Sequence, residues 1–429
     1  MWRWTASGLA MAAYRHRFLE PGLLCHVNEP ARALERESYY GGETECYRIG
    51  EFAERVQLLD VSSMYGAVMR GGSFPFKIVD YQSCHDKPRT TQPDIDPSAS
   101  IAEVTVNTNR RTVPLRGHFA NGKFTKLTRD GLGATPYRNQ QRTLHVLGTI
   151  RTTLAGPELA DLAAHGEIVA WHKWTTYEMR PLFKEYMEFF WAMRRRAKEN
   201  GDQQAEHIAK ISMNGLYGKF GQRAEKWLDM PGLSIGKRWG NLTTIGIEKR
   251  DVKEFRAVAG IVQQKTDQGE HINAVPSIAS FVTSFGREFM GGAKIAAGKS
   301  HTLYQAVDSL IVDETGYQNL LGCGMVEDAT MGKFRRQMSA HYCRIVGCNA
   351  VQLDAVWRLA GLPNINTQID HNTFECTTAE KMDAMLERTP DMKTKERVVN
   401  WKIPTKYSRA SVDLKGQVSP FVITPDGTY

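Results

Sequence analysis

The chain has 429 residues, of which 55 are Lys or Arg and 47 are Asp or Glu, so its formal net charge is +8. Hydrophobic residues make up 41% and charged residues 24%, which is typical of a folded globular protein and excludes a wholly disordered, collagen-like or coiled-coil chain. The length allows about two to four domains or subdomains. The mild positive charge is compatible with a nucleic-acid partner without requiring one.

The cysteines and the apolar runs exclude two further classes of protein. The seven cysteines form no CxxC pair, which favours reduced thiols over a disulfide framework or a zinc site. No apolar run approaches the length of about 18 residues that a membrane-spanning helix needs, so no membrane partner is expected.

The first predicted element is a helix that begins near Thr5 or Ser7 and turns Leu9 toward the interior. Basic residues follow the short apolar patch at once, which argues against a signal peptide. Residues 28–45 are polar and rich in turn formers, and they lead into the next element.

A buried strand is predicted over 56–59, where a short apolar run ends at Asp60. Residues 83–100 contain three prolines and predict a loop or insertion. A second strand is expected over 101–108, and 151–179 predicts a loop, a helix and a strand.

Residues 181–220 predict a helical hairpin, because an apolar stripe at helical spacing is interrupted at Asn200 and Gly201. A basic cluster over 194–198 lies near its tip. The alternative interpretation of this cluster is a solvent-exposed helix C-terminus, where cations are favoured.

The second half of the chain is mixed. Residues 221–275 are rich in strand formers and turns, and 277–298 are apolar at helical spacing. Residues 301–316 predict two short strands that meet at Val307 and Asp308, which puts a carboxylate at the bend of a hairpin.

Asp60 and Asp308 form the central hypothesis. Two carboxylates on adjacent strands can hold two divalent cations, which activate an attacking hydroxyl and stabilise the leaving oxygens of a phosphoryl group. Mg²⁺ suits such a site because it takes few carboxylates and completes its shell with water and phosphate oxygens. A lone aspartate at a strand end is more often a turn or cap residue, so neither acid is informative alone.

A group of cations and polar side chains is predicted on the helical hairpin. Lys210, Asn214 and Tyr217 have the spacing of one helical face. A lysine there can neutralise a triphosphate, and a tyrosine can pack on a base or sugar. Arg194 and Lys198 are four residues apart and can add to the same clamp.

The order of these motifs resembles the family B DNA polymerases, most closely the protein-primed branch of phages and linear plasmids. DVSSMYG over 60–66 is similar to motif A of that family, and YQAVDSLIV over 304–312 is similar to motif C. KISMNGLYGKFG over 210–221 is nearly complete as motif B and is the most specific match. Upstream, 39–42 resembles the family's Y-x-G-G element. The resemblance runs in the right order along nearly the whole chain.

The resemblance implies an α+β protein with the right-hand polymerase fold, in which an antiparallel-sheet palm carries helical fingers and a small thumb. The implied division of the chain is a linker and Y-x-G-G region over 1–50, palm over 51–180 with a loop-rich insertion at 75–150, fingers over 181–222, a second insertion over 223–275, palm with the third motif over 276–345, and thumb over 346–429.

The resemblance also implies roles for individual residues. Asp60 and Asp308 would be catalytic and would ligate two Mg²⁺ ions, for which Mn²⁺ can substitute. The residues implied in nucleotide binding are Tyr65, Arg194, Lys198, Lys210, Asn214 and Tyr217, with Tyr65 excluding a 2′-hydroxyl. Those implied in DNA binding are Tyr39, Gly41, Gly42, Ser63 and Lys219.

The implied activity is a DNA polymerase core that adds dNTPs to a primer 3′-hydroxyl on a DNA template, with a terminal priming protein as a further partner. The implied location is the cytoplasm of a bacterial host, with the gene carried by a phage or a linear plasmid. The family's N-terminal exonuclease domain is expected to be missing, because the chain begins just before the Y-x-G-G element.

Two departures from the family pattern keep alternatives open. Ala306 stands where motif C usually has its first aspartate, and Asn349, Ala350 and Val351 stand where a Lys-x-Tyr element is expected. The alternative is therefore an impaired polymerase relic that binds primer–template DNA without synthesis. A third interpretation, a polymerase that uses an RNA template or ribonucleotides, is disfavoured by Tyr65.

Overall fold

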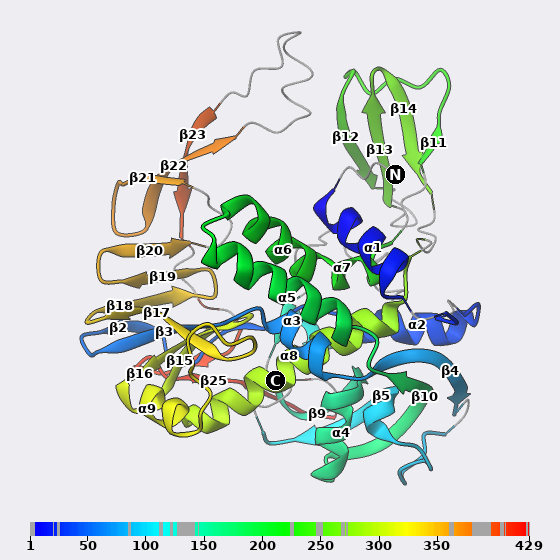
Figure 1. Ribbon diagram of the computed structural model, residues 1–429, viewed down its shortest axis with the longest axis horizontal. Helices are drawn as coiled ribbons and strands as arrows, with labels where there is room; N and C mark the ends of the chain where they lie inside the picture. Colours follow the sequence, from blue (N-terminus) through cyan, green and yellow to red (C-terminus); the bar gives the residue numbers. More distant parts are fainter. Residues whose placement is uncertain are drawn as a thin grey trace.

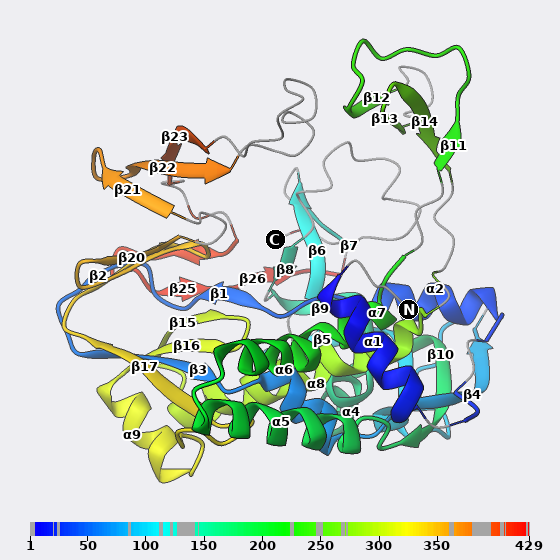
Figure 2. The same ribbon diagram turned by 45° about the horizontal axis from the view of Figure 1, so that its top comes forward.

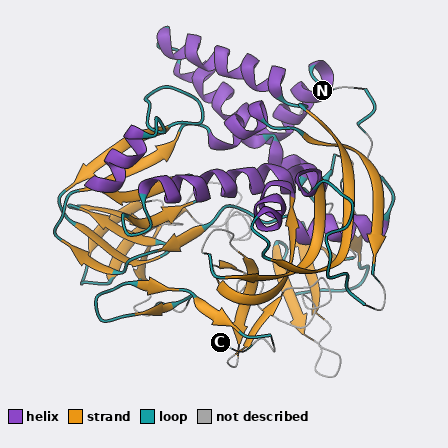
Figure 3. Ribbon diagram, turned by 90° about the horizontal axis from the view of Figure 1, so that it is seen from below, coloured by secondary structure: helices purple, strands orange, loops and turns teal. Residues whose placement is uncertain are grey.

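The structure is a computed structural model of the whole chain. The residues it describes are 5–19, 21–23, 26–84, 87–110, 115–120, 123–126, 142–144, 146–223, 227–245, 252–266, 271, 273–359, 364–379, 396–403, 407, 409–425 and 428. The arrangement is mixed α+β, as predicted, with sheets on either side of a long central helix (Figures 1 and 3).

A five-stranded antiparallel sheet carries the predicted catalytic acids. Its strand order is β1 (Thr44–Cys46), β15 (Thr302–Ala306), β16 (Ser309–Asp313), β3 (Val56–Val61) and β17 (Phe334–Ala340). Both faces of β3 are covered, because Leu59 packs toward the helices while Leu58 packs toward a second layer of strands. Burial on two faces explains why consecutive residues of this strand, Leu58 and Leu59, are both apolar.

A second five-stranded sheet lies at the other end of the central helix. Its order is β26 (Phe421–Ile423), β9 (Val146–Ala155), β5 (Ser100–Thr108), β10 (Ile168–Arg180) and β4 (Phe74–Ser83). Within the predicted insertion at 75–150, β5, nearly all of β4 and the first half of β9 are paired strands, while residues 127–141 lie outside the described part of the chain. The last strand, β26, runs parallel to β9, so residues 421–423, which the resemblance assigns to the thumb, pair with this sheet.

The helices connect the two sheets. They are α1 (Ala6–Arg17), α2 (Glu29–Ser38), α3 (Met64–Gly71), α4 (Gly156–Ala164), α5 (Lys184–Glu199), α6 (Gln203–Gly215), α7 (Tyr217–Phe220), α8 (Pro276–Ala297) and α9 (Glu314–Gly322), with a short 3-10 turn at Pro97–Ala99. Helix α8 is the central one, and its buried face contacts both layers.

The predicted helical hairpin is present as α5 and α6. Gly201, with a φ of 69°, allows the reversal between them. The Asp202 side chain accepts a hydrogen bond from the Ala205 amide and begins α6.

Helix α1 begins after Thr5, whose side chain accepts from the Gly8 amide, as predicted. The prediction that Leu9 faces inward is wrong, because its side chain is 55% exposed. The apolar patch is too short to fix the phase of the helix. Among the described helices, none is long and apolar enough to cross a membrane.

Smaller sheets complete the molecule. They are β2 (Gly50–Phe52) with β18 (Cys343–Gly347), β19 (Ala350–Leu353) and β20 (Val356–Leu359); β21 (Asn364–Gln368), β22 (Thr373–Ala379) and β23 (Glu396–Lys402); β11 (Trp227–Asp229), β12 (Gly240–Ile245), β13 (Val252–Val258) and β14 (Ile261–Lys265); β6 (Leu115–Ala120), β7 (Lys123–Lys126) and β8 (Arg142–Leu144); and β24 (Ser411–Val412) with β25 (Val418–Ser419). Sheets β21–β23 and β11–β14 project from the same side of the body (Figure 2).

Candidate active site

The structure brings Asp60 and Asp308 together, as predicted. Asp60 lies near the end of β3, directly opposite Ser309 of β16. The Ser309 hydroxyl donates to Asp60 Oδ1 at 3.0 Å, and the Val61 amide donates to the Asp308 carbonyl at 2.9 Å. The antiparallel register of β3 and β16 therefore places two acids from distant parts of the sequence side by side.

The electrostatics of this pair favour a divalent cation. Burial, followed by the negative charge of Asp60, raises the pKa of Asp308 to about 6. A cation held between the carboxylates would relieve this repulsion. In the part of the chain that the structure describes, no group of three or more His, Cys, Asp or Glu side chains surrounds a possible metal position. Two carboxylates nevertheless fit Mg²⁺, which uses one or two of them together with substrate phosphates and water.

Asp308 stands in a tight turn between β15 and β16. Val307 precedes it with a φ of 55°, a left-handed conformation that a β-branched residue rarely adopts. The Val307 amide donates to the Glu43 carbonyl at 2.6 Å. Gly42 lies against Val307 so closely that a Cβ atom at position 42 would be 2.6 Å from Val307 Cγ1.

Tyr65 and Tyr217 form one wall beside the acids. Their ring centroids are 4.5 Å apart with a tilt of 37°. Burial is the main cause that raises the pKa of both phenols. The face predicted for Lys210, Asn214 and Tyr217 is divided between two helices, because α6 ends at Gly215 and Tyr217 opens α7.

The predicted cations are only partly assembled. Arg194 donates to the Ser63 hydroxyl at 3.1 Å and lies 3.4 Å from Glu206, so it ties α5 to α6 and to the turn between β3 and α3. Lys198 and Lys210 are exposed, and neither forms an ion pair with another described residue.

Two further predicted residues lie along the same hairpin. Asn214 is exposed near the end of α6. Lys219 donates to the Gln222 side chain at 3.0 Å. No contact of either with the acidic pair is formed among the described side chains.

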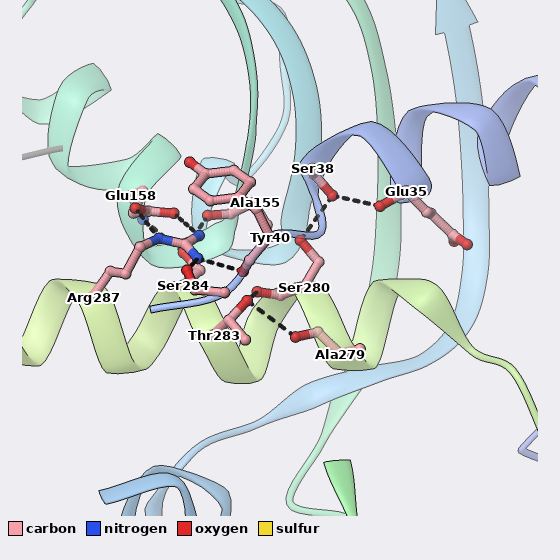
Figure 4. A network of polar contacts seen from close by, with 11 residues as sticks. Glu35, Ser38, Tyr40, Ala155, Glu158, Ala279, Ser280, Thr283, Ser284 and Arg287 are labelled. Carbon is pink, nitrogen blue, oxygen red and sulfur yellow. Dashed lines mark hydrogen bonds and ion pairs between the residues drawn. The ribbon is translucent and has the colours of Figure 1, made fainter. Parts of the chain in front are cut away.

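The segment 39–42 is held against the site from two sides. A Cβ atom at Gly221, the last residue of motif B, would be 2.3 Å from the Tyr39 ring. The Arg287 guanidinium donates to the Tyr40 carbonyl at 2.8 Å (Figure 4). It also donates to the Gly41 carbonyl at 3.0 Å. Its other nitrogens bind Glu158 at 2.6 and 2.8 Å, and both side chains are almost fully buried.

Sequence reasoning missed one basic residue next to Asp60. Arg335 of β17 lies directly opposite Asp60 on the side of β3 away from β16, and it is exposed. Residues directly opposite in an antiparallel pair project from the same face. Its neighbour Arg336 faces the other way and lies over the Tyr317 ring. Only the pairing register, which the sequence does not give, distinguishes the two.

A second missed group lies at the free edge of β1. Arg409 Nη1 donates to the Thr44 carbonyl at 2.5 Å and contacts Cys348 Sγ at 2.9 Å, while Tyr407 binds the Glu45 carboxylate. Arg409 thus contacts Cys348, which directly precedes residues 349–351, where the Lys-x-Tyr element is expected and is absent from the sequence. Sequence reasoning also missed the buried ion pair of Lys294 Nζ with Glu43 Oε2 at 2.9 Å.

Comparison with known proteins gives a consistent family match. The family model described as "DNA polymerase type B, organellar and viral" matches residues 1–230, a stretch that includes Asp60 and motif B and ends before Asp308. A curated relative, "Probable DNA polymerase" of Neurospora intermedia, is 25% identical over 227 residues. That match covers 52% of this chain and 21% of the relative, so the chain matches about a fifth of the relative's length.

Solved structures show the same fold at low sequence identity. Phi29 DNA polymerase in a ternary complex with primer–template DNA and incoming nucleotides matches with a TM-score of 0.60 and 12% identity, over 94% of this chain and 68% of that one. Phi29 DNA polymerase in an orthorhombic crystal form matches with a TM-score of 0.54 and 12% identity, over 84% and 58%. The same polymerase with single-stranded DNA matches with a TM-score of 0.54 and 14% identity, over 92% and 59%.

Proposed function

Because the chain belongs to the family of type B DNA polymerases described as organellar and viral, we propose that it extends a primer 3′-hydroxyl with dNTPs on a DNA template. The single observation that carries the proposal is that Asp60, near the end of β3, and Asp308, in the turn before β16, lie side by side, in the order along the chain that the family motifs require. The family description supports a genome of an organelle or a virus as the DNA that is copied.

In this proposal the two acids hold the divalent cations. Mg²⁺ ions bound there would activate the primer hydroxyl and offset the charge that develops on the transferred phosphoryl group. Ser309 holds the Asp60 carboxylate through its hydroxyl, which fixes one oxygen and leaves the other accessible to a cation. The leaving group is pyrophosphate.

The surrounding residues bind the substrates. Lys198 and Lys210, exposed and without described ion-pair partners, supply charge for the triphosphate. The Tyr65 ring, fixed by its contact with Tyr217, lies under the sugar and excludes a 2′-hydroxyl. Arg194 positions Ser63 and the turn between β3 and α3.

The proposed subdomains are the palm, fingers and thumb of the right-hand polymerase fold. Palm is assigned to the β1–β15–β16–β3–β17 sheet, fingers to α5 and α6, and thumb to strands β18–β23. Primer–template DNA is the proposed partner, with the 39–42 segment as one of its contacts. The phi29 DNA polymerase structure with a TM-score of 0.60 is a complex with primer–template DNA and incoming nucleotides, which supports this assignment. A terminal priming protein is a further proposed partner.

A primer-extension assay with Mg²⁺ or Mn²⁺ tests the proposal. Asp60→Asn and Asp308→Asn are expected to abolish incorporation while the protein stays folded. Asp313→Asn is the matched control, because Asp313 lies at the end of β16 that is remote from Asp308. Its carboxylate caps α9 by accepting a hydrogen bond from the Gly316 amide at 2.8 Å. Incorporation that survives at either of the two acids would refute the site.

A second candidate function has a specific observation in its favour. Ala306 replaces an acid of motif C, which favours an impaired relic that binds primer–template DNA without synthesis. This candidate predicts DNA binding that weakens steeply with salt and no incorporation by the wild-type chain. The same primer-extension assay, run beside a binding titration, decides between the two.

A further inference from the structure

Helix α8 carries a buried polar stripe that faces residues 38–43, the segment that leads into the site. Ser280, Arg287 and Lys294 recur every seven residues and therefore lie on one face of the helix. Each of them contacts a successive part of residues 38–43. The contacts are Ser280 Oγ to Ser38 Oγ at 2.7 Å, Arg287 to the Tyr40 carbonyl at 2.8 Å, and Lys294 Nζ to Glu43 Oε2 at 2.9 Å; the first two are drawn in Figure 4.

The last contact is a closed network of three side chains. Lys294 Nζ also donates to the Tyr47 hydroxyl at 2.9 Å, and that hydroxyl donates to Glu43 Oε1 at 2.9 Å. The side chains of Lys294 and Glu43 are 8% and 1% exposed. Each charged group therefore has its partners inside the protein.

This network lies one residue from the catalytic turn. The Glu43 carbonyl accepts the Val307 amide at 2.6 Å, and Thr44 pairs with Ala306 across β1 and β15. Val307 is held at a φ of 55°, and such a conformation persists only where the surroundings hold it in place. The backbone of residues 42–44 holds the turn from one side, while the Gln305 side chain and the Val61 amide donate to the carbonyls of Val307 and Asp308.

The physical chemistry of the pair argues for a positioning role. Burying two charges costs desolvation energy that their mutual attraction often fails to repay, so a buried ion pair is poor support for stability alone. A fully bonded buried network does fix one geometry of the chain around it. Its geometric consequence here is the position of the Glu43 carbonyl, and through it the position of Val307 and Asp308.

We propose that Glu43 and Lys294 are positioning residues for the metal site: their buried network fixes the Val307 turn and thereby the Asp308 carboxylate. The inference rests on the proposed function for its consequence, because it assumes that Asp308 binds a divalent cation. Glu43 itself stays with Lys294 and Tyr47 and does not replace the missing acid of motif C.

Two measurements on the full chain test the proposal. The first is hydrogen–deuterium exchange of the fragment that contains the Val307 amide, which reports the turn whatever the protein's function. The second is Mn²⁺ binding to the DNA-free protein, followed by electron paramagnetic resonance, with Asp308→Asn as the reference for lost binding.

The test variant is the neutral pair Lys294→Met with Glu43→Gln. We expect faster exchange of the Val307 amide and Mn²⁺ binding weaker by about tenfold, the lower end of the loss seen when partners of metal ligands are removed. The matched control is Lys265→Met with Glu254→Gln, which removes a 2.8 Å ion pair whose lysine is also 8% exposed but which lies in the β11–β14 sheet. The control should leave both measurements unchanged.

The outcomes separate the inference from the proposed function. If the neutral pair folds and leaves exchange and Mn²⁺ affinity as in the wild type, the inference is wrong. In a second outcome, hydrogen exchange is faster in the neutral pair, but the wild-type chain binds no Mn²⁺ through Asp308. The proposed function is then wrong, and so is the inference that the network positions a metal site. If the neutral pair does not fold, Tyr47→Phe decides, because it removes the bridging hydroxyl and keeps the ion pair: several-fold weaker Mn²⁺ binding supports the inference, and unchanged binding overturns it.

Discussion

Replacement of Gly42 by alanine tests how tightly the catalytic turn is packed. A Cβ atom there would lie 2.6 Å from Val307 Cγ1 and 3.1 Å from the Tyr65 hydroxyl. Carbon atoms in contact prefer about 3.5–4.0 Å, so Val307 and Gly42 would have to separate by about 1 Å. The backbone of Gly42 is outside the left-handed region, so the clash is the only penalty.

The displaced residue precedes Asp308, so the shift passes to the proposed metal ligand. A misplacement of about 1 Å can cost about 100-fold in rate. The overpacking itself is expected to cost about 1–3 kcal/mol of stability. Single-nucleotide incorporation, measured as kcat/KM, and the thermal midpoint Tm are the two readouts.

Two variants control the experiment. Gly41→Ala is expected to leave Tm unchanged, because no atom lies within 4 Å of a Cβ atom at that position. Val307→Ala removes the atom at 2.6 Å and should restore part of the activity in the Gly42→Ala background. Wild-type kcat/KM and Tm in Gly42→Ala would refute the reasoning.

Four further predictions follow from the described contacts. Arg335→Ala should raise the KM for dNTP about tenfold, which corresponds to the loss of one hydrogen bond to a charged group. Arg336→Ala, on the opposite face of β17, should leave KM unchanged, and equal effects of the two variants in steady-state kinetics would contradict the register argument. Tyr65→Val should increase ribonucleotide incorporation relative to deoxynucleotides in a competition assay, and unchanged discrimination would remove Tyr65 from its role. Ala306→Asp should lower the Mg²⁺ concentration for half-maximal activity, and an unaltered titration would argue against any electrostatic deficit at this position. Glu158→Gln leaves a buried guanidinium without its anion and should cost about 3–5 kcal/mol in urea unfolding, against little change if the pair were dispensable.

The sequence predicted those parts of the fold that local patterns determine. Strand β3, the β15–β16 hairpin and the α5–α6 hairpin all appear where apolar periodicity and breakers placed them. The neighbouring positions of Asp60 and Asp308 came from the family motifs, because nothing in the intervening sequence determines that β16 pairs with β3.

What the sequence did not predict depends on long-range partners. Glu43 and Lys294 are 251 positions apart, and Glu158 and Arg287 are 129 apart, so no local pattern marks them as pairs. Tyr217 was placed on the face of α6 because its spacing fits a helix. The chain instead ends α6 at Gly215 and opens a new helix at Tyr217, so that its ring packs on Tyr65.

The geometry of the sheet bears on the missing acid of motif C. Ala306 pairs with Ser309, and Ser309 pairs with Asp60, so β16 stands between Ala306 and Asp60. Two strand spacings amount to about 10 Å. A carboxylate at position 306 would therefore add charge only at the margin of the site. Asp308, in contrast, lies next to Asp60, because its own backbone carbonyl accepts a hydrogen bond from the Val61 amide. Mg²⁺ needs only one or two protein carboxylates when substrate phosphates complete its shell. The loss at 306 is thus expected to weaken metal binding while leaving Asp60 and Asp308, the two acids that would hold the ions, so Ala306 alone does not make the chain a relic.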